Sequence, residues 1–544
     1  MDLRTDSKPT PSISAPTVSG PLLSRRTFVH AIGITAGFVG LGRYLHAQVA
    51  PSAVAPGATG AAGAGRGGAA AGGGRGGRGG ANSVQPYLSE IEGYGPLVAD
   101  PRRIFDLPAG FTYKVIARCG ETMSDGLLNP GAPDGMAAFA GPEGRVILVQ
   151  NHELEAATPQ SGPYGTDYYL LPRLDAARIY DAGKGRPHNG GTTTIVYNPA
   201  TGTTEKMFLS LTGTLRNCAG GPTPWGTWIT CEEAVESVNE NNEKEHGYNF
   251  EVPASTAMGL TAPAPLKAMG RFNHEAVAVD PHTGIVYQTE DRNDGLIYRF
   301  IPVTPGQLAA GGKLQVLAVR GQKTFETRNY AETGGARLKV NQPMAVQWLD
   351  IDEIESPKDD LRTRGAALGA AIFARGEGMW FGNNEVYFAC TNGGLSQRGQ
   401  IFRYRPSPAE GTPGEEAYPG TLELYLEPNN SALLESCDNV TVAPWGDLII
   451  GEDNAAPAPV VGQGGSSNYL RGVTPEGKIY TLGRNRFLTA AELAGICFAP
   501  NHPTMFLNLQ VPGLTLAITG PWESLKKTPP RPIPEPAPTA APAT

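Results

Sequence analysis

Six residues of metal-ligand type begin six similar segments of this chain. In each segment the first residue is followed by alternating apolar residues, a Pro/Gly turn and a short strand that ends in an acid or an amide. The six first residues are Asp134, Cys218, Glu275, Glu377, Asp438 and Glu492. Carboxylates are ligands of hard cations, and a thiol beside them favours a transition metal. The pattern indicates metal chemistry if the fold brings these positions together.

The far ends of the segments supply further acids. The clearest segment runs from Asp438 through the turn at residues 444–446 to Asp453, whereas two other segments end without an acid, at Thr391 and Asn508. We expect four glutamates near these ends to form a second layer of ligands. They are Glu153, Glu232, Glu290 and Glu452.

The elements that must position these residues are β-hairpins. Two period-2 strands around a Pro/Gly turn predict a hairpin in each segment. Irregular repeats of hairpins without intervening helices favour a propeller, and the gaps between segments suit four-stranded blades of about 40–50 residues with inserted loops. We therefore predict an all-β fold, a six-bladed β-propeller. Its innermost strands line a central channel, so the six first residues would meet on one axis.

Five carboxylates in one channel would repel one another and lose hydration. Each unpaired buried ion costs several kcal/mol, and bound cations would offset that cost. A single acid more often caps a turn or lies on the surface, and a single Cys is more often buried and inert. Recurrence at one blade position favours ligands instead, with iron or zinc at Cys218. Arg375, two residues before Glu377, would either bind a phosphoryl group or pair with a channel acid.

Composition agrees with a propeller and excludes some functions. The 544 residues include 71 Gly and 48 Pro, and only 18% are charged, which suits many short strands and turns. Beyond residue 83 the chain holds 36 basic and 50 acidic residues, a net charge of about −14. Such an acidic body lacks the basic footprint of a nucleic-acid binder. The six cysteines are widely and irregularly spaced, so we expect buried thiols more than disulfides.

The termini differ from the body. Residues 1–50 resemble a twin-arginine signal peptide, because Arg25-Arg26 precede an apolar run that is too short to span a bilayer. No Cys follows that run, so we expect no lipoprotein anchor. Residues 51–85 form a Gly/Ala/Arg-rich linker and residues 526–544 a Pro/Ala-rich tail, and both compositions predict disorder. The body at residues 86–525 is predicted to be one domain with inserted loops.

Several segments of the body closely resemble the PhoX-type alkaline phosphatases. They include residues 107–111, 134–139, 151–153, 218–233, 272–291, 438–453 and 492–510, and the resemblance covers about residues 100–522. It implies a propeller that holds iron (Fe3+) and calcium (Ca2+) in its channel and acts on phosphate esters. It further implies that Cys218 is an iron ligand and that Arg375, in Arg375-Gly376-Glu377, binds the substrate phosphate. The other metal ligands implied are Glu275, Glu377, Asp438 and Glu492, with Glu153 and Glu232.

These observations predict an exported, metal-dependent phosphatase for small phosphate monoesters. The twin-arginine machinery would carry it to the periplasm or outside the cell, with no stable membrane anchor and no nucleic acid as structural partner. Two alternatives stay open. A calcium-dependent lactonase-like hydrolase would need fewer metals and no thiol ligand, and a non-catalytic propeller would use its metals only to close the channel.

Overall fold

The computed structural model describes residues 91–155, 161–335, 337–454, 467–487 and 491–525. The predicted leader, linker and tail lie outside these ranges. Regular structure in the described ranges is mostly β-strand, with the single α-helix α2 (Leu361–Leu368) and several 3-10 turns. None of the helices described there is both long and apolar enough to cross a membrane.

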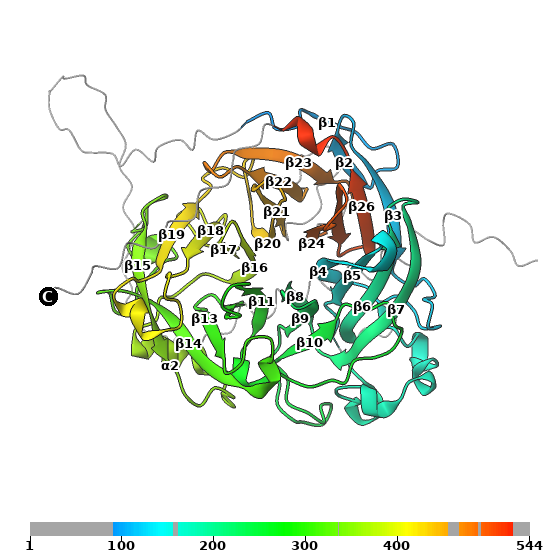
Figure 1. The fold of residues 1–544 in the computed structure, drawn as a ribbon, viewed down its shortest axis with the longest axis horizontal. Helices are drawn as coiled ribbons and strands as arrows, with labels where there is room; N and C mark the ends of the chain where they lie inside the picture. Colours follow the sequence, from blue (N-terminus) through cyan, green and yellow to red (C-terminus); the bar gives the residue numbers. More distant parts are fainter. Residues whose placement is uncertain (1–90, 156–160, 336, 455–466, 488–490, 526–544) are drawn as a thin grey trace, which may run out of the picture. The chain divides into compact units, whose positions relative to one another are not determined.

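The described strands form five antiparallel sheets arranged around a common centre (Figure 1). Two sheets have four strands: β4 (Pro133–Ala140), β5 (Val146–His152), β6 (Gly190–Asn198) and β7 (Thr203–Thr214), and β24 (Leu493–Phe498), β25 (Thr504–Leu509), β26 (Leu514–Thr519) and β3 (Thr112–Arg118). One sheet has three: β8 (Asn217–Pro222), β9 (Thr227–Glu232) and β10 (Asn249–Pro253). One has six: β20 (Cys437–Val442), β21 (Leu448–Glu452), β22 (Tyr469–Val473), β23 (Ile479–Asn485), β2 (Phe105–Pro108) and β1 (Leu97–Val98).

The fifth sheet has nine strands, and it changes the predicted blade count. Its order is β11 (His274–Val279), β12 (Val286–Glu290), β13 (Ile297–Pro302), β14 (Gly312–Val319), β15 (Met344–Asp350), β19 (Thr421–Leu426), β18 (Gln400–Arg405), β17 (Glu385–Cys390) and β16 (Gly376–Gly382). Strand β15 pairs with β14 on one side and, through Met344 and Ala345, with β19 on the other. The propeller-like, all-β fold is therefore confirmed, but six separate blades are not, because β15 joins two groups of four strands into one sheet.

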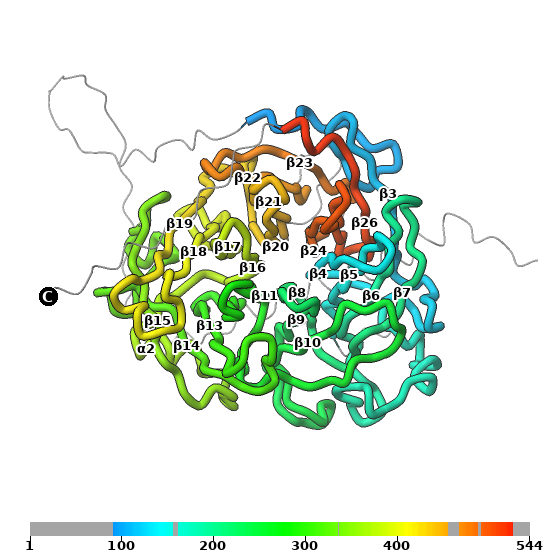
Figure 2. Tube along the Cα trace, viewed as in Figure 1, coloured from blue at the N-terminus to red at the C-terminus, as the bar shows by residue number. Residues whose placement is uncertain are grey.

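The two ends of the described chain meet in one sheet. Strand β3, near the beginning, pairs with β26, near the end, along Thr112–Arg118 (Figure 2). Hydrogen bonds between β3 and the last strand, β26, close the ring and hold the sheets around their centre.

Apolar side chains between neighbouring sheets form the core. Ile229 on β9, Val277 on β11 and Phe300 on β13 belong to one cluster of fully buried residues that joins the three-stranded and nine-stranded sheets. Burying one such side chain contributes about 1.5–3 kcal/mol. All six cysteines are free, as expected, and five of them are buried.

Candidate metal centre

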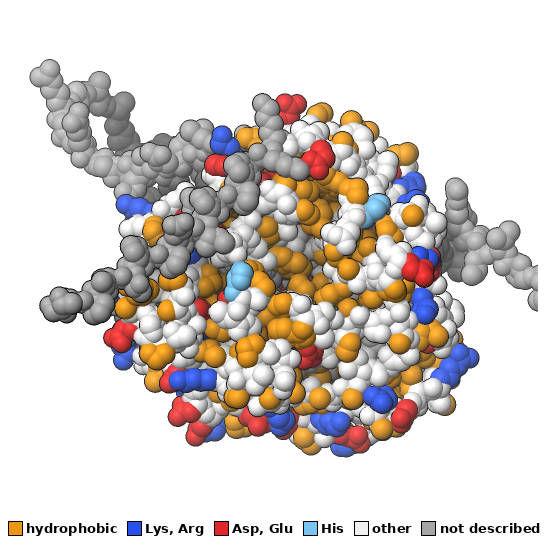
Figure 3. Space-filling view, in the orientation of Figure 1, with side chains coloured by type: hydrophobic (Ala, Val, Ile, Leu, Met, Phe, Trp, Pro, Cys, Tyr) orange, Lys and Arg blue, Asp and Glu red, His pale blue; other side chains and the backbone are white. Residues whose placement is uncertain are grey.

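Each of the six inner strands carries one of the predicted residues or begins directly after one. Strands β4, β8, β11, β16, β20 and β24 each lie at an end of a sheet's strand order and face the centre of the ring (Figure 1). Asp134, Cys218, Glu275, Glu377 and Asp438 lie within the first five of these strands. All five side chains are buried, with no more than 4% of each residue exposed. On the face shown in Figure 3 the surface is hollowed near the centre of the ring.

Three overlapping groups of side chains could hold metal ions there. They are Asp134, Glu153 and Cys218; Cys218, Glu233 and Glu275; and Glu275, Glu377 and Asp438. Within each group the possible ligand atoms lie within 4.8 Å of one another. Because Cys218 and Glu275 each belong to two groups, these seven residues form one continuous set, which we call the acidic cluster.

Glu492 joins this cluster at the Asp134 end. The Nε2 atom of Gln510 donates to Asp134 Oδ2 at 3.0 Å, to Glu153 Oε2 at 2.7 Å and to Glu492 Oε2 at 3.0 Å. One amide thus ties three carboxylates from three parts of the chain, and the structure brings together all six residues predicted to begin the segments.

A repeated backbone geometry places these residues. Arg216 and Arg375, two positions before Cys218 and Glu377, have φ angles of 47° and 49°, in the left-handed region that strains most non-glycine residues. Their carbonyls accept the N–H groups of Glu233 and Thr391, the residues just after β9 and β17. This hydrogen bond joins the start of each inner strand to the end of the next strand.

Glu492 departs from the predicted equivalence. Its carbonyl accepts the N–H of Gln510, so it occupies the position of Arg216 and Arg375 and not that of Cys218. Ala494 holds the equivalent of Cys218 in this last segment. Glu492 therefore lies two positions earlier in its hairpin than the other first residues do in theirs. Its side chain still reaches the cluster.

Three glutamates predicted as second-layer ligands lie elsewhere. Glu232 accepts the N–H groups of Gly247 and Tyr248, while Glu290 accepts the hydroxyl of Tyr298 at 2.8 Å. Glu452 accepts the N–H of Tyr469 at 2.9 Å and the Nε–H of Arg471 at 3.0 Å. None of these three glutamates belongs to a group of described residues that could hold an ion. Backbone and side-chain donors thus hydrogen-bond to each of these carboxylates, although Oε1 of Glu290 has no hydrogen-bond partner among the described residues.

At two of these strand ends, the residue that follows the predicted glutamate faces the cluster instead. Glu233 lies 2.8 Å from Cys218 Sγ, and Asp291 lies against Arg375. Successive side chains of a strand point to opposite faces, so a shift of one position separates a ligand from a structural acid. The sequence analysis missed Glu233 and Asp291, although both follow directly after a predicted glutamate.

The charges of the cluster oppose one another. Burial and the charges of Glu377, Glu233 and Asp438 raise the pKa of Glu275 well above its usual value. Burial, and then the charges of Glu153 and other acids of the cluster, raise the pKa of the Cys218 thiol in the same way. Ionised ligands are therefore stable in this cluster only when positive charge lies among them.

Two arginines supply part of that positive charge. Arg375 donates through Nε and Nη2 to the two oxygens of Asp291, both at 2.8 Å, and through Nη2 to Glu377 Oε1 at 2.6 Å. Although burial opposes it, this pairing lowers the pKa of Asp291 to about 2. Arg216 donates to Glu153 at 2.9 Å and to Glu233. Their side chains remain 30% and 25% exposed.

The donor set of the cluster fits metal ions. Glu275, Glu377 and Asp438 offer oxygen ligands alone, which suits hard cations such as Ca2+. Asp134, Glu153, Glu233 and Glu275 surround the thiol of Cys218, and a sulfur ligand among carboxylates suits a transition metal.

A family model described as "Alkaline phosphatase PhoX" matches residues 92–513. The chain belongs to the PhoX family of alkaline phosphatases. The match covers nearly the whole described body, and it includes every residue of the acidic cluster. The resemblance read from the sequence is thereby confirmed.

One solved structure supports the fold. PhoX of Pseudomonas fluorescens, in complex with vanadate as a transition-state analogue, has 18% identity, a TM-score of 0.56, and coverage of 80% of this chain and 98% of that one. A gluconolactonase of Xanthomonas campestris has 11% identity, a TM-score of 0.35, and coverage of 78% and 98%. The second likeness is too distant to support an argument. No curated protein sequence matches the chain.

Proposed function

We propose that this PhoX-family protein is an exported phosphatase that hydrolyses phosphate monoesters, with iron and calcium ions held by the acidic cluster. The observation that carries the proposal is the meeting of a buried thiol, at least six buried or half-buried carboxylates and a partly exposed arginine at one place. Family membership supports the same activity.

The two ends of the cluster would hold different ions. Cys218, with Asp134, Glu153, Glu233 and Glu275, would hold iron, because thiolates prefer transition metals. Glu377 and Asp438 would share calcium with Glu275, because oxygen ligands alone and flexible geometry suit that ion. When bound, such ions polarise a phosphoryl group and lower the pKa of water to yield a nucleophile.

Arg375 would bind the substrate phosphate. Its planar guanidinium suits bidentate recognition of a phosphoryl group, and its side chain is 30% exposed beside Glu377. Asp291 and Glu377 hold the guanidinium from two sides and fix its direction before substrate arrives. A group held in place in advance stabilises transition-state charge without a cost for reorganisation.

The export and architecture of the protein follow from the same proposal. A twin-arginine leader at residues 1–50 would carry the protein to the periplasm after metals are loaded in the cytoplasm. The nine-stranded sheet would act as two blades, which gives six inner strands around the channel.

An assay with and without chelator tests the function. Mature protein isolated after export should hydrolyse a chromogenic phosphomonoester, and chelation should abolish turnover until iron and calcium are restored. Protein that is fully loaded with both metals and shows no turnover at any pH would contradict the proposed activity.

A further inference from the structure

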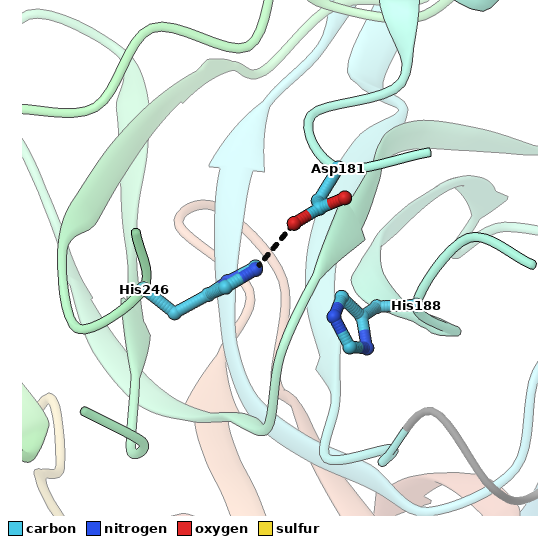
Figure 4. A group of neighbouring side chains, drawn as sticks. All are labelled: Asp181, His188 and His246. Carbon is cyan, nitrogen blue, oxygen red and sulfur yellow. Dashed lines mark hydrogen bonds and ion pairs between the residues drawn. The ribbon is translucent and has the colours of Figure 1, made fainter. Parts of the chain in front are cut away.

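A second group of possible ligands lies outside the acidic cluster. Asp181 and His188 come from one loop and His246 from another, and Figure 4 shows their side chains close together. Their possible ligand atoms lie within 4.8 Å of one another, and no more than 2% of any of the three residues is exposed. We call these three residues the histidine site.

The orientation of His246 is fixed by Glu232. His246 Nδ1 lies 2.6 Å from Glu232 Oε1, and the same carboxylate accepts the backbone N–H groups of Leu215 and Gly247. Glu232 thus accepts hydrogen bonds from the backbone and from the Nδ1–H of His246. Carboxylates that hold one nitrogen of a histidine commonly orient the other nitrogen toward a metal.

The other nitrogen faces a second carboxylate. His246 Nε2 lies 3.1 Å from Asp181 Oδ2, and Asp181 also accepts the backbone N–H groups of Gly183, Glu243 and Lys244. A positive charge must therefore lie between the nitrogen and the oxygen, either as a proton or as a cation. A proton leaves one net negative charge on His246, Asp181 and Glu232 together, whereas a divalent ion balances both carboxylates.

His188 adds a third possible ligand beside Asp181 and His246. Its ring stands edge-on to His246 with 4.9 Å between ring centroids. Its Nε2 lies 3.0 Å from Asn242 Oδ1, and its Nδ1 is buried without a hydrogen-bond partner among the described residues. An imidazole in this position is a common metal ligand.

We propose that Asp181, His188 and His246 bind a divalent transition-metal ion of the zinc type. Two imidazoles and one carboxylate are a typical zinc ligand set. The site is closed to solvent, so the ion has a structural role. It fastens the loop at residues 161–189 to the loop at residues 233–248.

This site is connected to the acidic cluster through one strand end. Glu232 and Glu233 are consecutive residues at the end of β9; the first orients His246 and the second contacts Cys218. An ion at the histidine site therefore steadies a residue of the acidic cluster without sharing its ligands.

The test compares zinc binding by two variants of the full-length protein. The glutamine in His188→Gln keeps an amide donor for Asn242 but is a poor zinc ligand. His282→Gln is the matched control, because His282 is exposed and has a similar contact, Nε2 to Asn384 Oδ1 at 3.2 Å. After chelation and reloading with Zn2+ alone, wild type and H282Q should bind one more zinc ion per chain than H188Q. Zinc should raise their Tm more than that of H188Q.

A measurement on wild type needs no variant. The acidic cluster offers only oxygen and sulfur ligands, so imidazole scattering in the zinc X-ray absorption spectrum reports the histidine site. The proposal predicts two imidazoles per bound ion at the first equivalent of zinc. Absence of imidazole scattering, or equal zinc binding by folded H188Q and wild type, would overturn it.

Discussion

Two sets of buried acids lie one residue apart on the same strand ends, and their surroundings differ completely. Glu290 is surrounded by donors, namely the hydroxyl of Tyr298 and the N–H of Leu296, whereas Asp291 and Glu233 lie among carboxylates and arginines. The first set accepts hydrogen bonds from the protein itself, although Oε1 of Glu290 has no hydrogen-bond partner among the described residues. The second set brings negative charges together and requires cations. Burial of an acid therefore does not reveal a ligand, but its neighbours do.

The largest effect should come from neutralising Glu275, the carboxylate that belongs to two groups of possible ligands. Glu275→Gln should lower kcat/KM for a phosphomonoester by about 10³-fold or more and reduce metal content, because it weakens both ends of the cluster. Glu290→Gln, the matched change on the same hairpin, should keep activity within about threefold. Equal losses in the two variants would mean that the two sets do not differ in function.

The two cysteines of one hairpin offer the next comparison. Cys218 faces Glu233, whereas Cys231 is buried in the apolar core. Cys218→Ser should remove iron and lower activity by about 10²-fold, since a hydroxyl is a poor ligand for it. Cys231→Ser should leave iron bound and lower only the unfolding free energy, by about 1–3 kcal/mol. Full iron content and phosphatase activity in folded C218S would show that Cys218 is not an iron ligand.

A smaller effect is expected from changing Asp291, which holds Arg375 in place. Asp291→Asn replaces the carboxylate that holds Arg375 with a neutral amide, so KM for the phosphomonoester should rise about tenfold while metal content stays unchanged. Asp294→Asn is the control, because this exposed acid pairs with Arg362 instead. Steady-state kinetics on metal-loaded protein should show the rise in KM for D291N and not for D294N. An unchanged KM in D291N would remove Arg375 from substrate binding.

The smallest effect concerns stability and pH. Burial raises the pKa of Glu290 to about 7. The folded state then keeps a proton that the unfolded state releases above its ordinary pKa of about 4.3. Glu290 makes its full contribution to the free energy of unfolding below that pKa. This contribution, about 3 kcal/mol in all, is lost as pH rises through 7. Denaturant unfolding of wild type relative to Glu290→Gln should show this loss, and the exposed Glu143→Gln should not.

The sequence predicted the hairpins and the acids at their starts because period-2 alternation and turn residues are local properties. It did not predict which of two adjacent acids at a hairpin end faces the centre. That choice depends on a bulge early in each inner strand, such as the register shift between Asn217 and Gly220, which alternation does not reveal. The nine-stranded sheet was missed because β15 pairs not only with β14 before it but also with β19, which is remote in sequence. Asp181 and His188 lie in a loop without any pattern.

Elemental analysis of wild type and Glu275→Gln, each isolated after export and assayed at the same time, tests the central claim most directly. We predict iron and calcium in active wild type, and loss of metal together with activity in the variant. Wild type that hydrolyses phosphomonoesters while free of both metals, with its acidic cluster intact, would contradict the claim.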